Sequence, residues 1–158
     1  MREQTCCFSG HRNLTPARPQ HIYNLLAKHV LALIHSGVSV FICGGARGFD
    51  TLAALSVLKA RALYPHIRLV LALPSPQQTT GWPAKEVQLY QNILAQADEV
   101  VYMASEYHAG CLHMRNRYMV DHSRYCLCFL TKLTGGTAHT IAYAKKQQLQ
   151  IYNLASEP

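Results

Sequence analysis

The sequence has no long apolar run and few acidic residues. It carries 8 Asp and Glu against 15 Lys and Arg, which gives a formal net charge of +7. No apolar stretch approaches the roughly 18 to 20 residues that a membrane-spanning helix needs. The first residues, Met1-Arg2-Glu3-Gln4, lack the charged-then-apolar pattern of a signal peptide. We therefore expect a cytoplasmic protein without a membrane partner, whose positive charge favours anionic ligands.

The sequence also lacks the usual metal-binding motifs. None of its 6 cysteines forms a Cys-x-x-Cys pair, and its 9 histidines show no His-Glu-x-x-His spacing. Cys111 is expected in a loop. The others are expected in strands, where a reduced cysteine behaves as a small apolar side chain; these are Cys6, Cys7, Cys43, Cys126 and Cys128. We expect no metal site.

Short apolar segments alternate between the periods of strands and helices. The chain has 158 residues, 49% of them hydrophobic, which suits one domain over residues 1–158. Predicted strands cover 4–9, 38–43, 67–73, 99–103 and 125–131, with an edge strand at 150–154. Predicted helices follow Pro16 and Pro19 up to Gly37, follow Gly48 up to Pro65, and cover 83–96, 112–123 and 137–147. This alternation predicts an α/β fold with a mostly parallel sheet and helices on both faces.

Two glycine-rich loops each join a predicted strand to a predicted helix. They are Gly44-Gly45-Ala46-Arg47-Gly48 and Gly135-Gly136-Thr137. A helix start leaves backbone N–H groups without partners and carries partial positive charge, so both loops predict phosphate binding. In a parallel sheet such loops meet beyond the carboxyl ends of the strands.

The first loop has neither the Lys-Ser/Thr of a P-loop nor the spacing of a Gly-x-Gly-x-x-Gly fingerprint. Arg47 either binds a phosphate or is incidental to a tight turn. Asp50 either caps the following helix, which is the favoured interpretation, or accepts a hydrogen bond from a ribose hydroxyl. Thr137 in the second loop can cap its helix, bind a phosphate oxygen, or do both.

Two further segments are candidates for the same site. Ser9-Gly10-His11-Arg12 follows the first strand and either holds an oxyanion or is a solvated turn. On the helix after residue 112, Arg115 shares a face with Met119, whereas Arg117 and Asp121 share another and are expected to form a surface pair. Arg115 is therefore the candidate for the site.

A Pro-, Gln- and Thr-rich loop at 74–83 is of the kind that covers binding sites. It carries Trp82, the only tryptophan. Trp82 or Tyr118 is a candidate to stack on a base, and Trp82 is equally suited to be a surface anchor.

Three motifs resemble the YpsA-type branch of the SLOG superfamily. They are Cys6-Cys7-Phe8-Ser9-Gly10-His11-Arg12, the segment from Gly44 to Ala54, and the segment from Met114 to Asp121. The resemblance implies a Rossmann-like three-layer fold, a role in sensing or processing nucleotide-derived ligands, and a homodimer. The ligands it suggests are AMP, ADP-ribose or an NAD-derived molecule.

Two related families suggest alternatives. Arg115 with Met119, and Gly136-Thr137, are similar to motifs of the Lonely Guy enzymes, which release the base from nucleoside 5′-monophosphates. However, Asn116 stands where those enzymes have lysine and Thr140 stands where they have glutamate. A threonine hydroxyl is no general base near neutral pH, so we expect binding rather than hydrolysis. If the bond is cleaved, the catalytic candidates are Arg115, Asp50 and Asp121.

The segment from Gly44 to Ala54 also resembles the DNA-processing protein A family, which binds single-stranded DNA. Nucleic acid is thus an alternative partner, because a basic groove with stacking aromatic side chains is what such binding needs. The leading prediction is a nucleotide-binding or nucleotide-sensing protein. Its expected ligand-binding residues are Ser9, Gly10, His11, Arg12, Gly44, Gly45, Ala46, Arg47, Gly48, Asp50, Arg115, Gly135, Gly136 and Thr137.

Overall fold

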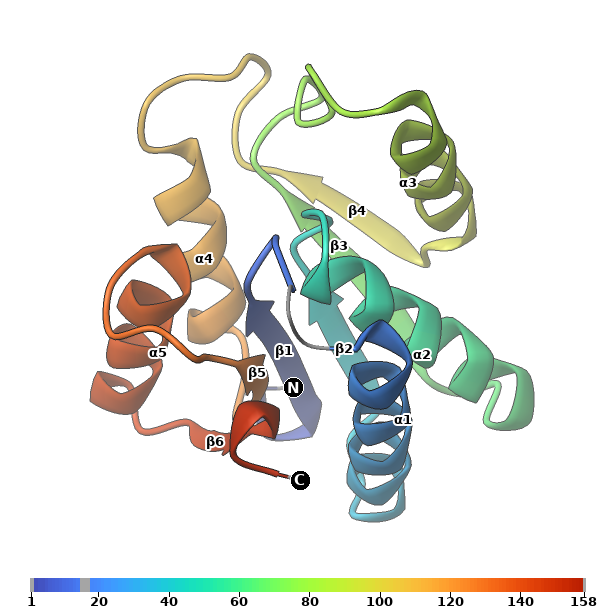
Figure 1. Ribbon diagram of the computed structural model, residues 1–158. Helices are drawn as coiled ribbons and strands as arrows, with labels where there is room; N and C mark the ends of the chain where they lie inside the picture. The colour runs from blue at the N-terminus through green and yellow to red at the C-terminus, as the bar shows by residue number, and fades with distance from the viewer. Residues whose placement is uncertain (1, 15–17, 158) are drawn as a thin grey trace.

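The computed structural model describes residues 2–14 and 18–157, which form an α/β fold around one parallel sheet (Figure 1). The sheet has six strands in the order β4-β3-β2-β1-β5-β6, and all neighbours are parallel. The strands are β1 (Thr5–Gly10), β2 (Val40–Cys43), β3 (Arg68–Leu73), β4 (Glu99–Tyr102), β5 (Tyr125–Phe129) and β6 (Gln150–Asn153). The predicted parallel sheet is confirmed.

The helices alternate with the strands, as the sequence periodicity predicts. They are α1 (Pro19–His35), α2 (Phe49–Leu63), α3 (Ala84–Gln96), α4 (Cys111–Asp121) and α5 (Gly136–Lys146). Short 3-10 helices flank the sheet at Arg2–Gln4 and Leu154–Ser156. Pro16, expected just before the first helix, lies outside the described residues.

One prediction about the elements is wrong. Cys111 lies not in a loop but at the first position of α4, where its side chain is buried. Its thiol donates to the carbonyl oxygen of His108 at 2.9 Å, and its sulfur accepts from the His108 N–H at 3.0 Å. The cysteine therefore closes the turn that starts the helix, a role that a polar side chain more often fills.

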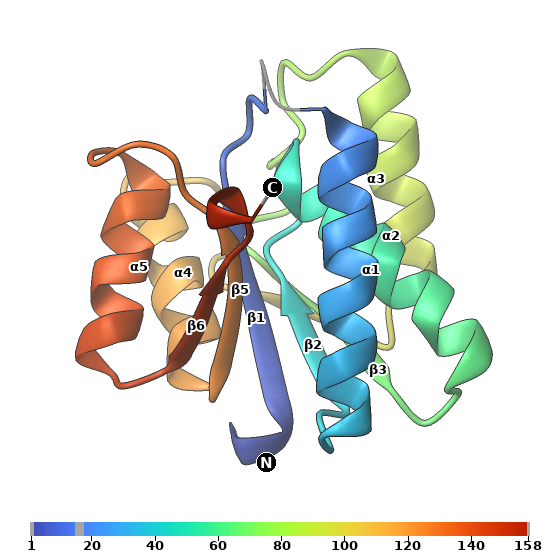
Figure 2. The ribbon, with the colours of Figure 1, turned by 60° about the horizontal axis from the view of Figure 1, so that its bottom comes forward.

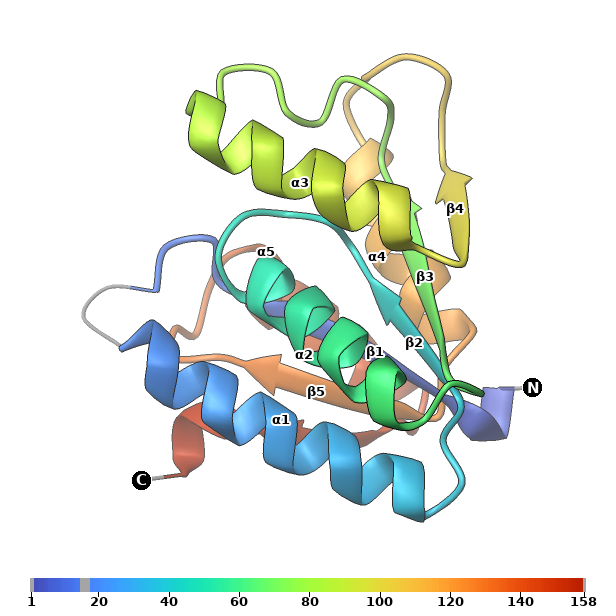
Figure 3. The same ribbon diagram turned by 90° about the vertical axis from the view of Figure 1, so that its right-hand side faces the viewer.

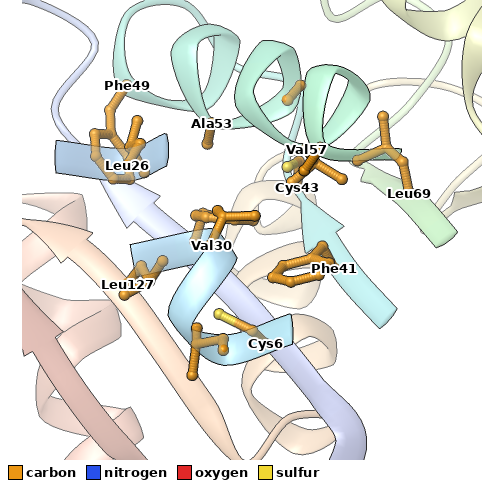
Figure 4. Close-up of a cluster of buried hydrophobic side chains, with 14 of the residues drawn as sticks. Cys6, Leu26, Val30, Phe41, Cys43, Phe49, Ala53, Val57, Leu69 and Leu127 are labelled. Atoms are coloured by element: carbon orange, nitrogen blue, oxygen red, sulfur yellow. The ribbon is translucent and has the colours of Figure 1, made fainter. Parts of the chain in front are cut away.

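The sheet separates two hydrophobic layers. On one face α1, α2 and α3 cover a cluster that includes Phe8, Phe41 and Leu127 (Figures 3 and 4). On the other face α4 and α5 cover a smaller cluster, which contains three of the buried cysteines (Figure 2). The four inner strands, β1, β2, β3 and β5, carry buried residues on both faces of the sheet, which explains why their sequences read as mostly continuous apolar runs.

The order of the strands reverses beside β1. The chain runs from β1 through β2 and β3 to β4, and then crosses to β5 on the opposite side of β1. β1 and β5 are in register to their ends, where Gly10 is opposite Phe129. The loops that follow these two strands must diverge to opposite faces, which leaves a crevice at their carboxyl ends.

Candidate functional site

A cleft of about 500 Å³ occupies this crevice. Its walls come from the end of β1 and the loop after it, the start of α2 and the loop before it, the first three turns of α4, and the start of α5 with the loop that leads into it. The lining residues are 8–13, 46, 50, 112, 113, 115, 116, 119, 132, 134–137 and 140. The volume lies within the range of small-molecule sites.

A buried carboxylate and a buried guanidinium share the floor of this cleft. Asp50 is only 6% exposed and Arg115 only 4% exposed. Burial raises the pKa of Asp50, an effect that the charge of Arg115 and the N–H of Ala46 oppose. Burial lowers the pKa of Arg115, and the charge of Asp50 opposes this. Each group therefore stabilises the charged form of the other.

Asp50 does not cap its helix. Gly48 is the N-cap residue of α2 and Asp50 is the second residue of the helix. Its Oδ2 accepts a hydrogen bond from the N–H of Ala46 at 3.2 Å, so it fastens the preceding loop instead. The favoured interpretation of Asp50 as a cap is thus wrong, because the loop bends back over the first turn.

Arg115 is held by three polar neighbours. Its Nη1 donates to the carbonyl oxygen of Gly44 and to Oε1 of Gln78, the latter at 3.3 Å. Its Nε donates to Oδ1 of Asn116 at 2.8 Å. Gln78 in turn donates from Nε2 to the carbonyl oxygen of Gly45 at 3.0 Å. The loop at 74–83 thus contacts the first glycine loop and Arg115 through one side chain.

The rim of the cleft is cationic. Arg12 and Lys132 are exposed on the loops after β1 and β5. His11 accepts the N–H of Thr131 at Nε2, at 3.0 Å, and burial together with Lys132 lowers its pKa. α5 begins at Gly136, so the N–H groups of its first turn face the site without intrahelical partners. Cations at the rim and a helix start suit an anionic ligand.

The close approach of β1 to α2 explains one glycine of the site. A Cβ on Gly10 would lie 2.3 Å from the ring of Phe49, which is fully buried beneath the cleft. Only glycine fits between the end of β1 and this ring. The Ser9 and His11 side chains on either side of it reach the cleft.

The first glycine loop lies largely outside the cleft. Ala46 lines it, but Gly44 lies against Arg115, and Gly45 lies against Leu73. Arg47 is bound by Glu86 through two hydrogen bonds, of 2.9 and 2.7 Å, and lines a second cavity together with Gly48. The structure therefore brings together the candidates around Ser9, Arg115 and Gly135, but not Arg47.

The two aromatic candidates also lie elsewhere. Trp82 packs edge-to-face on Tyr90, with ring centroids 5.5 Å apart, and Tyr118 stacks on His122 at 4.1 Å. Asp121 accepts a hydrogen bond from the hydroxyl of Tyr143 at 2.7 Å.

Tyr143 contacts both Arg117 and Asp121, the two residues that were expected to form a surface pair. The guanidinium of Arg117 lies over the ring of Tyr143, with Cζ 4.9 Å from its centroid, while Asp121 binds the hydroxyl. Thr140, the residue at the position of the hydrolase glutamate, does line the cleft, and its hydroxyl donates to the carbonyl oxygen of Gly136 at 2.9 Å.

Sequence reasoning missed Asn13, Gln78, His113 and Lys132. Lys132 lies three residues after the end of β5 and directly after the predicted strand 125–131, so its position beyond the carboxyl end of a strand was a signal that could have found it. Gln78 gives no such signal, because its contacts join segments that are 33 and 37 residues apart.

The described residues show neither a membrane-spanning helix nor a metal site. No helix there is long and apolar enough to cross a bilayer. In the same residues, no three His, Cys, Asp or Glu side chains are grouped so that they could hold a metal ion.

A parallel sheet covered by helices on both faces, with a cleft at its switch point, defines a Rossmann-like α/β protein. The family model YpsA, which is described as the YspA SLOG family, matches residues 10–156. The chain therefore belongs to this family.

Two relatives support this assignment. An uncharacterized SPbeta prophage-derived protein of Bacillus subtilis, YoqJ, is 32% identical over 121 residues, which are 69% of this chain and 71% of that protein. A UPF0398 protein of Halalkalibacterium halodurans is 30% identical over 144 residues, 89% of this chain and 74% of that protein.

Solved structures share the fold. DNA processing protein A from Helicobacter pylori, described with a single-stranded DNA binding mode, superimposes with a TM-score of 0.69 at 22% identity. The corresponding protein from Streptococcus pneumoniae gives 0.67 at 15% identity. This chain is covered to 95% and 96% but spans only 64% and 50% of those chains.

Proposed function

We propose that the protein binds a nucleotide or a nucleotide-derived small molecule, with its phosphate in the cleft between the loops that follow β1 and β5. The observation that carries this proposal is the meeting of Arg12, Lys132 and the first turn of α5 around one cavity at the switch point. Parallel α/β sheets bind ligands at this place in their topology.

The phosphate is assigned to the N–H groups at the start of α5. Gly135 and Gly136 carry no side chain that would keep an anion from the main chain, and a Cβ on either would meet nothing within 4 Å. Arg12 and Lys132 reach the cleft from two sides and neutralise the charge. Thr137 stands in the first turn, where its hydroxyl supplies a further donor.

The ribose is assigned to the side of the cleft that Asp50 lines. Asp50 is the one carboxylate among the described residues that line the cavity. A carboxylate accepts hydrogen bonds from sugar hydroxyls, and the charge of Arg115 favours the ionised form of Asp50, opposing the burial that raises its pKa. The ligand is then oriented from the α5 loop toward α2.

Isothermal titration calorimetry with AMP tests this proposal. Wild type should bind, and Lys132→Ala and Arg12→Ala should each weaken the affinity about tenfold, the loss of one charge-assisted hydrogen bond. Arg124→Ala is the matched control, because Arg124 is an exposed arginine just before β5, at the opposite end of that strand. Failure of wild type to bind, or an equal loss in the control, would refute the proposal.

Single-stranded DNA is a second candidate ligand, favoured by the fold shared with the two DNA processing proteins and by the net charge of +7. An oligonucleotide shift assay at increasing salt concentration tests it. Contacts with several phosphates give an affinity that falls steeply with salt. Binding that does not change with salt would remove this candidate and leave the small molecule.

A further inference from the structure

The cleft continues past Arg12 and Asn13 into a second depression. These two residues line both the cleft and a neighbouring cavity of about 630 Å³. That cavity shares Arg47, Gly48 and Glu86 with a third one, of about 170 Å³, which ends at Trp82. The two outer cavities form one surface, here named the Trp82 groove. It is lined by Arg12, Asn13, Leu14, Pro19, Arg47, Gly48, Thr51, Leu52, Trp82, Glu86 and Leu89.

The Trp82 groove lies at the first turns of α1, α2 and α3. These three helices all begin on the same side of the molecule (Figure 3). Pro19 begins α1, Thr51 and Leu52 belong to the first turn of α2, and Glu86 belongs to the first turn of α3. The groove is therefore built on helices that the hydrophobic core fixes in place.

Beyond Arg12, which lies where the Trp82 groove meets the cleft, the charge in the groove is compensated. Arg47 and Glu86 form a two-point ion pair, with the closest N–O distance 2.7 Å and side chains 41% and 39% exposed. The remaining lining is mostly apolar, from leucine, proline and tryptophan side chains. Because the cleft is cationic and the groove beyond Arg12 is neutral, the two favour different parts of a ligand, an anion in the first and an uncharged ring in the second.

Trp82 provides a flat surface at the far end. It meets Tyr90 at an interplanar angle of 84°, so Tyr90 leaves at least one face of the indole uncovered. An aromatic ring that enters the groove can stack on this face, and its polar edge can reach the Arg47–Glu86 pair. A nucleobase or a nicotinamide ring has both features.

We infer that the Trp82 groove binds the second ring system of a ligand in which two nucleoside-like halves are joined by a pyrophosphate. The first half occupies the cleft, the pyrophosphate passes Arg12, and the second half enters the groove. This inference rests on the proposed function and narrows its ligand to dinucleotides such as NAD. No mononucleotide would fill both sites.

Tryptophan fluorescence tests the inference directly, because Trp82 is the only tryptophan in the chain. NAD should change the emission of Trp82 on binding, whereas AMP should bind without changing it. Calorimetry should show that NAD binds wild type at least tenfold more tightly than AMP. Trp82→Ala should lower the NAD affinity about tenfold, as expected for the loss of one stacking partner, and leave the AMP affinity unchanged.

Tyr107→Ala is the matched control, since this aromatic residue is 55% exposed on the loop before α4. Retained AMP binding by Trp82→Ala shows that the variant is folded. Glu86→Gln, which weakens the ion pair without shortening the side chain, should lower the NAD affinity alone. If AMP binds but NAD binds no more tightly, or AMP alone changes the Trp82 emission, the inference is overturned while the proposed function stands. If neither ligand binds, both are refuted.

Discussion

Arg115 in α4 donates a hydrogen bond from Nη1 to the carbonyl oxygen of Gly44, 71 residues earlier in the chain. This contact joins the two motifs that flank the cleft. It also places a permanent cation beside Asp50, whose carboxylate is almost completely buried. The charged side chain of Arg115 therefore connects the loop after β2 to α4, which covers the face of the sheet opposite α2.

Replacing Arg115 with methionine should destabilise the protein by about 3–5 kcal/mol near neutral pH, because Asp50 then carries a buried charge without its counter-ion. The pKa of Asp50 is already raised by burial, and loss of Arg115 raises it further. A carboxyl group whose folded pKa exceeds its unfolded value favours the fold at low pH and loses this contribution as pH rises. The loss of stability of Arg115→Met relative to wild type should therefore be larger at about pH 8 than at about pH 4.

Urea denaturation of wild type and Arg115→Met at both pH values measures this effect. The double variant Arg115→Met/Asp50→Asn is the control, because it removes the titrating group. Its deficit relative to wild type should depend much less on pH. A deficit of Arg115→Met that shrinks as pH rises would contradict the electrostatic explanation.

Replacing Gly44 with alanine should cost about 1–3 kcal/mol of stability. A Cβ at this position would lie 2.7 Å from Nη1 of Arg115 and 2.9 Å from Oδ2 of Asp50. Gly136→Ala is the matched control, since its Cβ would meet nothing within 4 Å. Thermal unfolding should show a lower midpoint for Gly44→Ala only. Equal unfolding midpoints for the two variants would show that the side chains of Arg115 and Asp50 move aside at little cost in stability.

Much of the fold follows from the sequence because its signals are local. The apolar stripe of α1 and the apolar run of β2 each reflect burial that the chain itself displays, and both elements lie within two residues of their predicted bounds. The position of the four predicted loops after parallel strands also placed them all beyond the carboxyl ends of the sheet, and residues of three of these loops line the cleft. The sequence signals could not predict which residue each charged side chain contacts.

Arg47 illustrates the difference. Its place between glycines at a helix start predicts phosphate binding, yet Glu86, 39 residues later, lies within hydrogen-bond distance. That contact depends on how α3 packs beside α2, which no local pattern reveals. Arg115, by contrast, became a cleft residue because α4 packs across the end of β1 with this side chain inward.

His11 should make stability depend on pH near neutrality. Its pKa is lowered in the fold, so the unfolded chain takes up the proton first as the pH falls. Stability contributed by neutral His11 is then complete above its ordinary pKa and is lost below it. Between about pH 7.5 and 5.5, His11→Gln should lose less stability than wild type, because glutamine does not titrate, while its amide oxygen can still accept the N–H of Thr131.

Thermal unfolding across this pH range checks the His11 prediction. His21→Gln, on the exposed side of α1, is the matched control and should follow wild type. An identical pH dependence in wild type and His11→Gln would show that other histidines are responsible.

Gln78→Ala should loosen the first glycine loop. The variant loses the hydrogen bonds to the carbonyl oxygen of Gly45 and to Arg115, at a cost of about 1–2 kcal/mol. Hydrogen exchange of the amides at 44–48 should be faster than in wild type. Gln77→Ala controls for the loop itself, because Gln77 bonds Tyr107 in an exposed position and leaves residues 44–48 untouched. Faster exchange in both variants would assign the effect to the whole loop.

AMP should remain intact when incubated with the protein. Release of the base requires a group that takes a proton from water, and the hydroxyl of Thr140 instead donates to Gly136 within α5. Asp121 is bonded to Tyr143. That leaves Asp50, a residue only 6% exposed, whose Oδ2 accepts the N–H of Ala46, so that its carboxylate has little access to water. Chromatography of adenine after prolonged incubation checks this. Release that Asp50→Asn abolishes and Arg124→Ala retains would instead show that the buried carboxylate reaches water and acts as the base.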